Sequence, residues 1–263
     1  MVFQTDPKVF IALLSPLVIS GCYSTPYVKN DTKRLITPEI HSEPFKVTLA
    51  AAASKSDEIT PRYDELNVND GDLSIEARMT TGGGGEIFIS SGEVEGAGFV
   101  YQFMGEHFDV APVHNISAAI SAGYYRFKSD QVASDDYTGW EVEQHMVDVS
   151  LIAGFRTHDR GLLFASVFYR GGDIDVNVIP ELSEQDELSS YFYRRIFTCD
   201  DLSDNCTGNQ FEATSQISGF NFGYRHDFYK WLSLTGEIVY YQEDVFDKKQ
   251  SDQAINFKVG FHF

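Results

Sequence analysis

The feature of this sequence that most restricts its fold is the alternation of apolar and polar residues along most of its length. In the last segment, apolar residues at every second position from Ile255 to Phe263 alternate with residues such as Asn256 and Lys258. A period of two residues places successive side chains on opposite faces of a β-strand. The pattern recurs in eight segments, at about 73–81, 95–104, 115–127, 141–156, 161–177, 212–226, 231–243 and 253–263. It predicts an all-β fold of eight antiparallel strands.

The links between these strands alternate in length. The short links cover about 105–114, 157–160 and 227–230, and the long ones cover about 128–140, 178–211 and 244–252. Short turns at one end and long loops at the other are typical of β-barrels of the bacterial outer membrane. We therefore predict a transmembrane barrel over residues 72–263, with periplasmic turns and extracellular loops. The glycine run 82–85 is interpreted as a flexible loop or bend.

Charge and hydropathy exclude several classes of protein. The 39 acidic and 20 basic residues give a net charge of -19, whereas a nucleic-acid-binding protein needs a cationic face. No window approaches the roughly 20 apolar residues that a transmembrane helix needs. The sequence has neither a G-x-S-x-G nor an H-E-x-x-H motif, and most of its histidines map to the predicted periplasmic end. We expect no catalytic residues, no metal and no cofactor.

The first residues of the chain have the order of an export signal. A basic residue precedes an apolar run from Val9 to Ile19, and a small pair then leads to Cys22,. This stretch resembles the lipobox of bacterial lipoproteins. The resemblance implies a signal peptide over residues 1–21, lipid attachment at Cys22, contact with the lipoprotein-sorting machinery and delivery to the outer membrane. A buried N-terminal strand or helix with an incidental cysteine is the alternative.

The stretch that follows lacks a sustained period. Residues 22–71 contain scattered Pro, Ser, Thr and mixed charge, apart from a short apolar run at 47–53. Such a composition is typical of linkers and loosely packed segments. We interpret residues 22–71 as the lipidated N-terminus and an irregular periplasmic linker.

Two further cysteines lie in an acidic, turn-rich stretch. Cys199 and Cys206 are separated by six residues, and an exported location permits a disulfide between them. The alternative, a pair of thiolate metal ligands, lacks a second Cys or His pair at zinc spacing. We therefore predict a disulfide that closes a small loop.

The polar faces of the strands predict a charged lumen. Eight strands enclose a space only wide enough for side chains to fill, and buried charges need partners. If the last strand pairs with the first, Lys258 lies between Glu237 on one side and Glu76 with Arg78 on the other. The predicted lumenal network comprises Glu76, Arg78, Asp148, Arg156, Arg225, Glu237 and Lys258. A narrow proton or ion path is the functional alternative to this structural interpretation.

The C-terminal strand carries a resemblance to a known family. With aromatic residues at Phe257 and Phe261 and a terminal Phe263, the sequence resembles small outer-membrane β-barrels of the OmpA, OmpX and opacity-protein kind. Lys258 stands where the assembly signal of that family usually has glycine. The resemblance implies an eight-stranded barrel that contacts outer-membrane lipid and lipopolysaccharide and is inserted by the barrel-assembly machinery. Because some such barrels modify lipid A, it also leaves a lipid-modifying enzyme open.

The predicted outward loops are the remaining candidate for function. Segments 82–95, 128–141, 173–210 and 243–252 together carry most of the net negative charge. The longest also contains Tyr191, Tyr193, Arg194 and Arg195, and aromatic and arginine residues are typical binding anchors,. We predict a non-enzymatic barrel with a structural, adhesive or surface-binding role and an extracellular or periplasmic protein partner. A narrow channel, a lipid-modifying enzyme and a soluble β-sandwich lipoprotein are the alternatives.

Overall fold

The computed structural model describes residues 28–59, 67–131, 139–179, 210–245 and 248–263. Within these ranges the chain forms one sheet of eleven strands. They are β1 (Val28–Asp31), β2 (Val47–Ile59), β3 (Asn67–Gly82), β4 (Gly85–Ser91), β5 (Val94–Met104), β6 (Ile116–Gln131), β7 (Gly139–His158), β8 (Gly161–Ile179), β9 (Gln210–Tyr229), β10 (Leu232–Val245) and β11 (Lys248–His262). No helix in the described part of the chain is long and apolar enough to cross a membrane.

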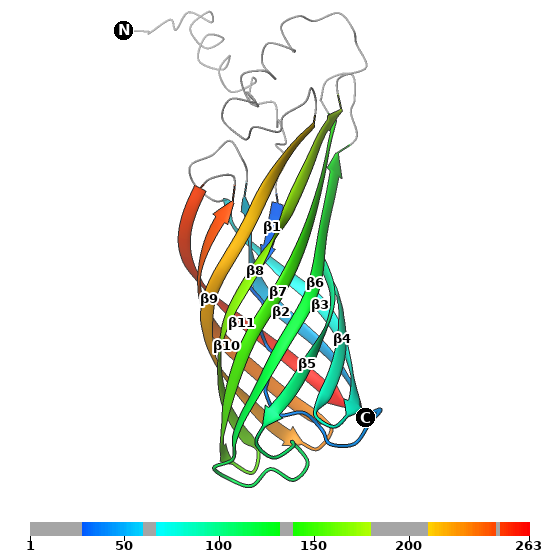
Figure 1. Cartoon of the computed structure of the whole chain (residues 1–263), viewed down its shortest axis with the longest axis vertical. Coiled ribbons are helices and arrows are strands. Elements are labelled where there is room, and N and C mark those ends of the chain that lie inside the picture. The colour runs from blue at the N-terminus through cyan, green and yellow to red at the C-terminus, as the bar shows by residue number, and fades with distance from the viewer. Residues whose placement is uncertain (1–27, 60–66, 132–138, 180–209, 246–247) are drawn as a thin grey trace, which may run out of the picture.

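Strands β2 to β11 close into an antiparallel barrel (Figure 1). Each strand pairs with the next along the chain, and the ring closes because β2 pairs with both β3 and β11. The barrel therefore has ten strands, and the predicted number of eight is wrong. The missed strands are β2, whose run Ala50–Ala53 contains no apolar–polar alternation, and β4, which has only seven residues and follows the glycine run.

The two ends of the barrel differ. The short-turn end holds the links at 83–84, 105–115, 159–160 and 230–231 together with Phe263, and it is the lower end in Figure 1. The long-loop end holds the links at 60–66, 92–93, 132–138, 180–209 and 246–247. Because an even number of strands forms the ring, β2 begins and β11 ends at the short-turn end, where Val47 and Phe263 exchange backbone hydrogen bonds of 3.3 and 2.8 Å.

The half of the barrel next to the short-turn end has an apolar outer face and a polar lumen. On β7, Val147, Val149 and Leu151 point outward and are about half exposed, whereas Asp148 and Ser150 point inward and are buried. The outward apolar run on this strand ends at Phe155, so it spans nine residues. A transmembrane β-strand needs about 9–11 residues. An apolar band around a closed polar barrel is the architecture of an outer-membrane protein, and this chain is a barrel of that kind.

Beyond this band the polarity of the two faces is reversed. On β7, Glu141 and Glu143 now point outward, whereas Trp140, Val142 and Met146 are buried inside with exposures of 5, 0 and 1%. We call the parts of β6 to β9 on the long-loop side of the paired row Tyr124, Val147, Gly171 and Gln216 the membrane-distal extension. Figure 1 shows these four strands rising beyond the others. Because its outside is charged and its inside apolar, the extension has the pattern of a protein that stands in water.

The lumen is occupied by a segment of the chain itself, residues 28–41, which we call the lumenal strap. It starts with β1 beside the long-loop end of β2, descends inside the ring, and leaves near the short-turn end (Figure 1). Val28, Leu35 and Ile40 are at most 3% exposed. The interpretation of residues 22–71 as a periplasmic linker is therefore wrong for 28–41, which lies in the lumen, and for β2, which belongs to the barrel. The barrel begins at Val47 rather than at residue 72.

The wider ring explains why the strap fits. The diameter of a β-barrel grows with the number of strands, and eight strands already suffice for side chains alone to fill the interior. Ten strands leave additional space, and polar lumen walls would lose hydrogen bonds if that space were filled by apolar residues. A strap rich in Lys, Arg, Asp and Thr supplies the missing partners.

Candidate functional site

The strap meets the barrel wall in three clusters of buried charges, which together form the candidate site. In the first cluster, nearest the long-loop end, Arg34 lies 3.2 Å from Asp148, measured from Nη1 to Oδ2, and its guanidinium stacks 3.9 Å above the ring of Phe168. Arg170 donates to the same carboxylate at 3.1 Å and to the backbone carbonyl of Asp31 at 3.0 Å. One carboxylate of the wall thus forms ion pairs with two arginines, one from the strap and one from β8,.

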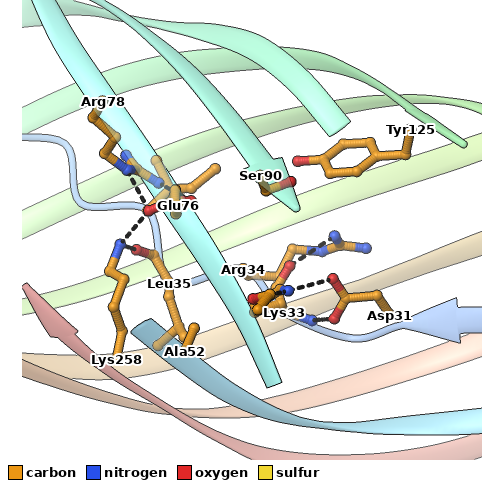
Figure 2. A pocket seen from close by; sticks show the side chains of 12 residues that line it. Asp31, Lys33, Arg34, Leu35, Ala52, Glu76, Arg78, Ser90, Tyr125 and Lys258 are labelled. Atoms are coloured by element: carbon orange, nitrogen blue, oxygen red, sulfur yellow. Dashed lines mark hydrogen bonds and ion pairs between the residues drawn. The ribbon is translucent and has the colours of Figure 1, made fainter. Parts of the chain in front are cut away.

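The second cluster lies at the junction of β11, β2 and β3 (Figure 2). Lys258 lies 3.3 Å from Glu76, which also accepts hydrogen bonds of 2.6 and 2.9 Å from Arg78. Arg78 reaches on to Glu86 at 2.8 Å, and Lys258 donates in addition to the strap carbonyl of Leu35. The alternating charges compensate one another, as buried ions require.

The contact between Lys258 and Glu76 depends on a strand that the sequence did not reveal. In the structure β2 lies between β11 and β3, and its residue opposite Lys258 is Ala52. Because alanine has a small side chain, the lysine can reach across β2 to the carboxylate on β3. Beside these residues lies a cavity of about 20 Å³ lined by strap and wall side chains, which is enough room for about one water molecule.

Glu237 is held by uncharged groups. Its carboxylate accepts hydrogen bonds from Asn256 at 2.9 Å, from the backbone amide of Arg34 at 2.7 Å and from Asn221. Lys258 was expected to lie next to Glu237, but these two side chains contact different partners. Asn256 also bonds to the backbone carbonyl of Thr32 at 3.2 Å. Glu237 and Asn256 thus fix the backbone of the strap rather than a charged side chain.

The third cluster lies toward the short-turn end. Glu39 of the strap is fully buried and pairs with Arg156, whose Nε donates to it at 3.0 Å, and with Asn115, which donates at 2.9 Å. Arg225 lies 2.8 Å from Asp227 on the same strand. The ring of Phe108, in the link 105–115, lies under both arginines, at 5.1 Å from Arg156 and 4.4 Å from Arg225,. This link therefore packs against the lumenal arginines near the short-turn end.

A polar clamp holds the strap where it leaves the lumen. The amide of Ile40 donates to Gln102 at 2.9 Å, and Phe108 donates to the carbonyl of Ile40 at 3.0 Å. His41 and the amide of Ser42 both bond to Asp109. Although partial burial alone would raise the pKa of Asp109, these hydrogen bonds from His41 and Ser42 hold it below its ordinary value,. The clamp therefore joins the strap to the link 105–115 while this carboxyl is ionised.

The strap also packs against the wall without charges. A Cβ atom added to Gly154 on β7 would lie 2.6 Å from Pro38 of the strap and 2.9 Å from Ser117. Gly154→Ala should therefore displace the strap and lower the free energy of unfolding by about 1–3 kcal/mol, the usual cost of overpacking. Gly236→Ala is the matched control, since its nearest neighbour would be 3.4 Å away. Urea unfolding in lipid vesicles measures both, and equal stability of the two variants would contradict this packing.

Several predicted site residues lie outside the described residues. These are the lipid-attachment candidate Cys22, the predicted disulfide pair Cys199 and Cys206, the signal peptide 1–21, and the loop anchors Tyr191, Tyr193, Arg194 and Arg195. By contrast, all seven predicted lumenal residues lie in described strands. The strap partners Asp31, Arg34 and Glu39 were missed, because nothing in a segment without periodicity indicates that it is enclosed.

The outer face of the membrane-distal extension carries a second group of charges. Arg126 pairs with Glu143, and Lys128 lies 2.5 Å from Glu141. His145 contacts Glu143 at 3.1 Å and the hydroxyl of Tyr124. On the neighbouring strands, Glu143 pairs in register with Asp175, and Asp175 with Glu212.

This face is strongly acidic. Two basic side chains, Arg126 and Lys128, stand on it with the acidic side chains Asp130, Glu141, Glu143, Asp173, Asp175 and Glu212. Like charges opposite each other on adjacent strands destabilise a sheet. The row Glu143, Asp175 and Glu212 thus brings three like charges together, of which Glu143 is compensated by Arg126.

Known proteins resemble this chain only weakly. No family model matches the chain, and no curated protein sequence matches it. Among solved structures it is similar to Ail, the attachment invasion locus protein of Yersinia pestis, with 8% identity, a TM-score of 0.37, and coverage of 84% of this chain and 100% of that chain. Neisserial surface protein A gives 13% identity, a TM-score of 0.36, and coverage of 83% and 97%. The outer membrane protease OmpT of Escherichia coli gives 6% identity, a TM-score of 0.42, and coverage of 88% and 100%. At these values the likeness carries no information about function.

Proposed function

We propose that this protein is a non-enzymatic, closed outer-membrane barrel that presents an acidic surface outside the cell and binds partners with a basic surface. The observation that carries the proposal is the reversal of polarity on β6 to β9, which marks a rigid wall standing beyond the membrane with a charged outer face. Short turns face the periplasm in bacterial outer-membrane barrels and long loops face the exterior, which supports an extracellular position for this wall. An acyl anchor at Cys22 and a disulfide between Cys199 and Cys206 belong to the same proposal.

The filled lumen supports binding rather than transport. Strap and wall side chains form ion pairs at separate levels of the lumen, Arg34 with Asp148 and Glu39 with Arg156. A cavity beside Lys33, Glu76 and Lys258 has a volume of about 20 Å³, which suits a water molecule and not a passing solute. Wild-type protein should therefore be electrically silent in a planar bilayer.

The in-register acidic row supports a basic partner. A surface with charges of one sign attracts a partner of the opposite charge and speeds its association. Salt screens this attraction and so weakens binding. A cationic group placed over Glu143, Asp175 and Glu212 would add to the compensation that Arg126 gives Glu143, because the register brings the three acids side by side on three strands. The partner would then bind at the place where the repulsion between neighbouring acidic side chains is reduced.

Neutralising the acidic row tests this proposal. The triple variant Glu143→Gln, Asp175→Asn, Glu212→Gln should bind a fluorescent Lys/Arg-rich peptide about tenfold more weakly than wild type in nanodiscs, since each exposed pair contributes up to about 1 kcal/mol. Titration at two salt concentrations should show a smaller salt dependence for the variant. The peptide is a probe of surface charge and stands in for the natural partner.

A control with the same change in net charge separates a site from bulk charge. Glu43→Gln, Glu106→Gln, Asp159→Asn removes three exposed acids at the short-turn end. It should leave peptide affinity within about twofold of wild type, because these charges lie beyond a Debye length from the extension. Equal weakening in both triple variants would refute a binding surface on the extension.

A further inference from the structure

We propose that the strap carries the N-terminal end of the chain through the barrel, so that the segment preceding Val28 is displayed at the cell surface and an acyl group on Cys22 lies in the outer leaflet. This inference rests on the orientation and the acyl anchor of the proposed function. It differs from the sequence interpretation, in which the lipid holds a linker in the periplasm.

The direction of the strap is established at both of its ends. At the long-loop end, Val28 pairs with Ile59, the last residue of β2, and Lys29 forms an ion pair with Glu93 in the link between β4 and β5. At the other end, the chain enters β2 at Val47, which bonds to Phe263 at the short-turn end. The chain therefore crosses the full height of the lumen between residues 28 and 47, with its N-terminal side at the long loops.

Side-chain contacts at several levels hold this direction. From the long-loop end downward, Arg34 meets Asp148, the carbonyl of Leu35 meets Lys258, and Glu39 meets Arg156. Two of these pairs join the strap to β7, at Asp148 and Arg156, and the third joins it to β11. Reversing or sliding the strap would separate these pairs together and leave several buried charges without partners.

The packing around the strap argues against a return of the chain through the lumen. A second extended segment would need a channel as wide as a backbone with its side chains, whereas the cavity beside Lys33 to Ile36 of the strap measures about 20 Å³. The polar atoms of the wall at this level are already used by the strap, as Glu237 and Asn256 illustrate. The described chain therefore begins at the long-loop end, and the inference takes the residues before Val28 to continue on that side.

The reach of the chain then places Cys22. Val28 lies six positions after Cys22, and an extended chain covers at most about 3.6 Å per residue, or roughly 20 Å in all. The 13 residues of β2, at about 3.3 Å per residue and a tilt of about 40°, rise roughly 30 Å. From the long-loop end Cys22 cannot reach the short-turn end even by a direct path, but the outer leaflet, which lies nearer to the long-loop end, is within reach.

Two epitope insertions in the full-length chain test the inference. One epitope is placed between Thr25 and Pro26, and the other between Val110 and Ala111, where the link 105–115 is exposed at the short-turn end. On intact cells, a membrane-impermeant antibody should label the first epitope at least about tenfold more strongly than the second. After permeabilisation of the outer membrane the two signals should become equal. A heat-dependent mobility shift on SDS gels confirms that each variant has formed its barrel.

The outcomes separate this inference from the proposed function. If the two epitopes lie on the same side of the membrane, the inferred path of the strap is wrong. Epitopes on opposite sides, with only the one at Val110 labelled on intact cells, overturn the proposed orientation and with it the surface display. Labelling with a radioactive fatty acid, compared between wild type and Cys22→Ala, reports the acyl group separately. If wild type incorporates no labelled fatty acid, the placement of a lipid in the outer leaflet is wrong, whatever the antibody shows.

Discussion

Replacing residues 28–40 of the strap with a Gly/Ser segment of equal length is expected to convert the silent barrel into a conducting pore. The ring of ten strands closes through β2 and does not need the strap for any strand pairing other than β1 with β2. Because a Gly/Ser chain has no charged side chains near Asp148, Lys258 and Arg156, no ion pair holds it in the lumen. Water and ions would then solvate the exposed charges, as in larger barrels with polar interiors.

Single-channel recording in planar bilayers measures this change. The variant should give discrete, reproducible conductance steps, whereas wild type should give none under the same voltage. A Gly/Ser replacement of residues 132–138, at the long-loop end, is the matched control and should stay silent. A strap variant that shows the normal heat-dependent mobility shift and yet does not conduct would mean that wall side chains alone close the lumen.

The sequence predicted the strands of the barrel far better than its filling. Alternation identified eight of the ten strands because one face of each meets lipid and the other meets charged groups, as on β11, where Phe257 points outward and Asn256 inward. It failed at β2, because alanines at 50 to 53 are small enough to suit both faces. It failed at β4, because seven residues after a glycine run are too few to show a period.

The candidate site shows a similar division. Period-two reasoning placed Asp148, Arg156 and Glu237 on the inward face, since the side of a strand follows from its neighbours. Their partners depend on tertiary structure: Arg34 and Glu39 come from a strap more than a hundred residues away in sequence. Mixed charge without periodicity is typical of linkers in water. The same composition suits an enclosed segment whose surroundings are charged, and sequence alone does not distinguish the two.

Removal of Glu39 should have the largest effect of any single substitution in the strap. Its side chain is fully buried, and it is the acidic partner of Arg156 as well as the acceptor for Asn115. Glu39→Ala leaves the arginine charge buried beside Phe108 and is expected to lower the free energy of unfolding by about 3–5 kcal/mol. Urea unfolding in lipid vesicles, followed by tryptophan fluorescence, measures this loss.

Two further variants distinguish a buried ion pair from general damage to the strap. Glu43→Ala removes an exposed carboxylate that lies 3.1 Å from Lys46 and should cost less than about 1 kcal/mol. The double variant Glu39→Leu, Arg156→Met removes both charges and should recover most of the stability lost in Glu39→Ala, because the cost comes from the unpaired arginine rather than from the absence of an attraction. If the double variant is as unstable as Glu39→Ala, the Asn115 hydrogen bond and the shape of the glutamate must hold the strap, and its charge is incidental.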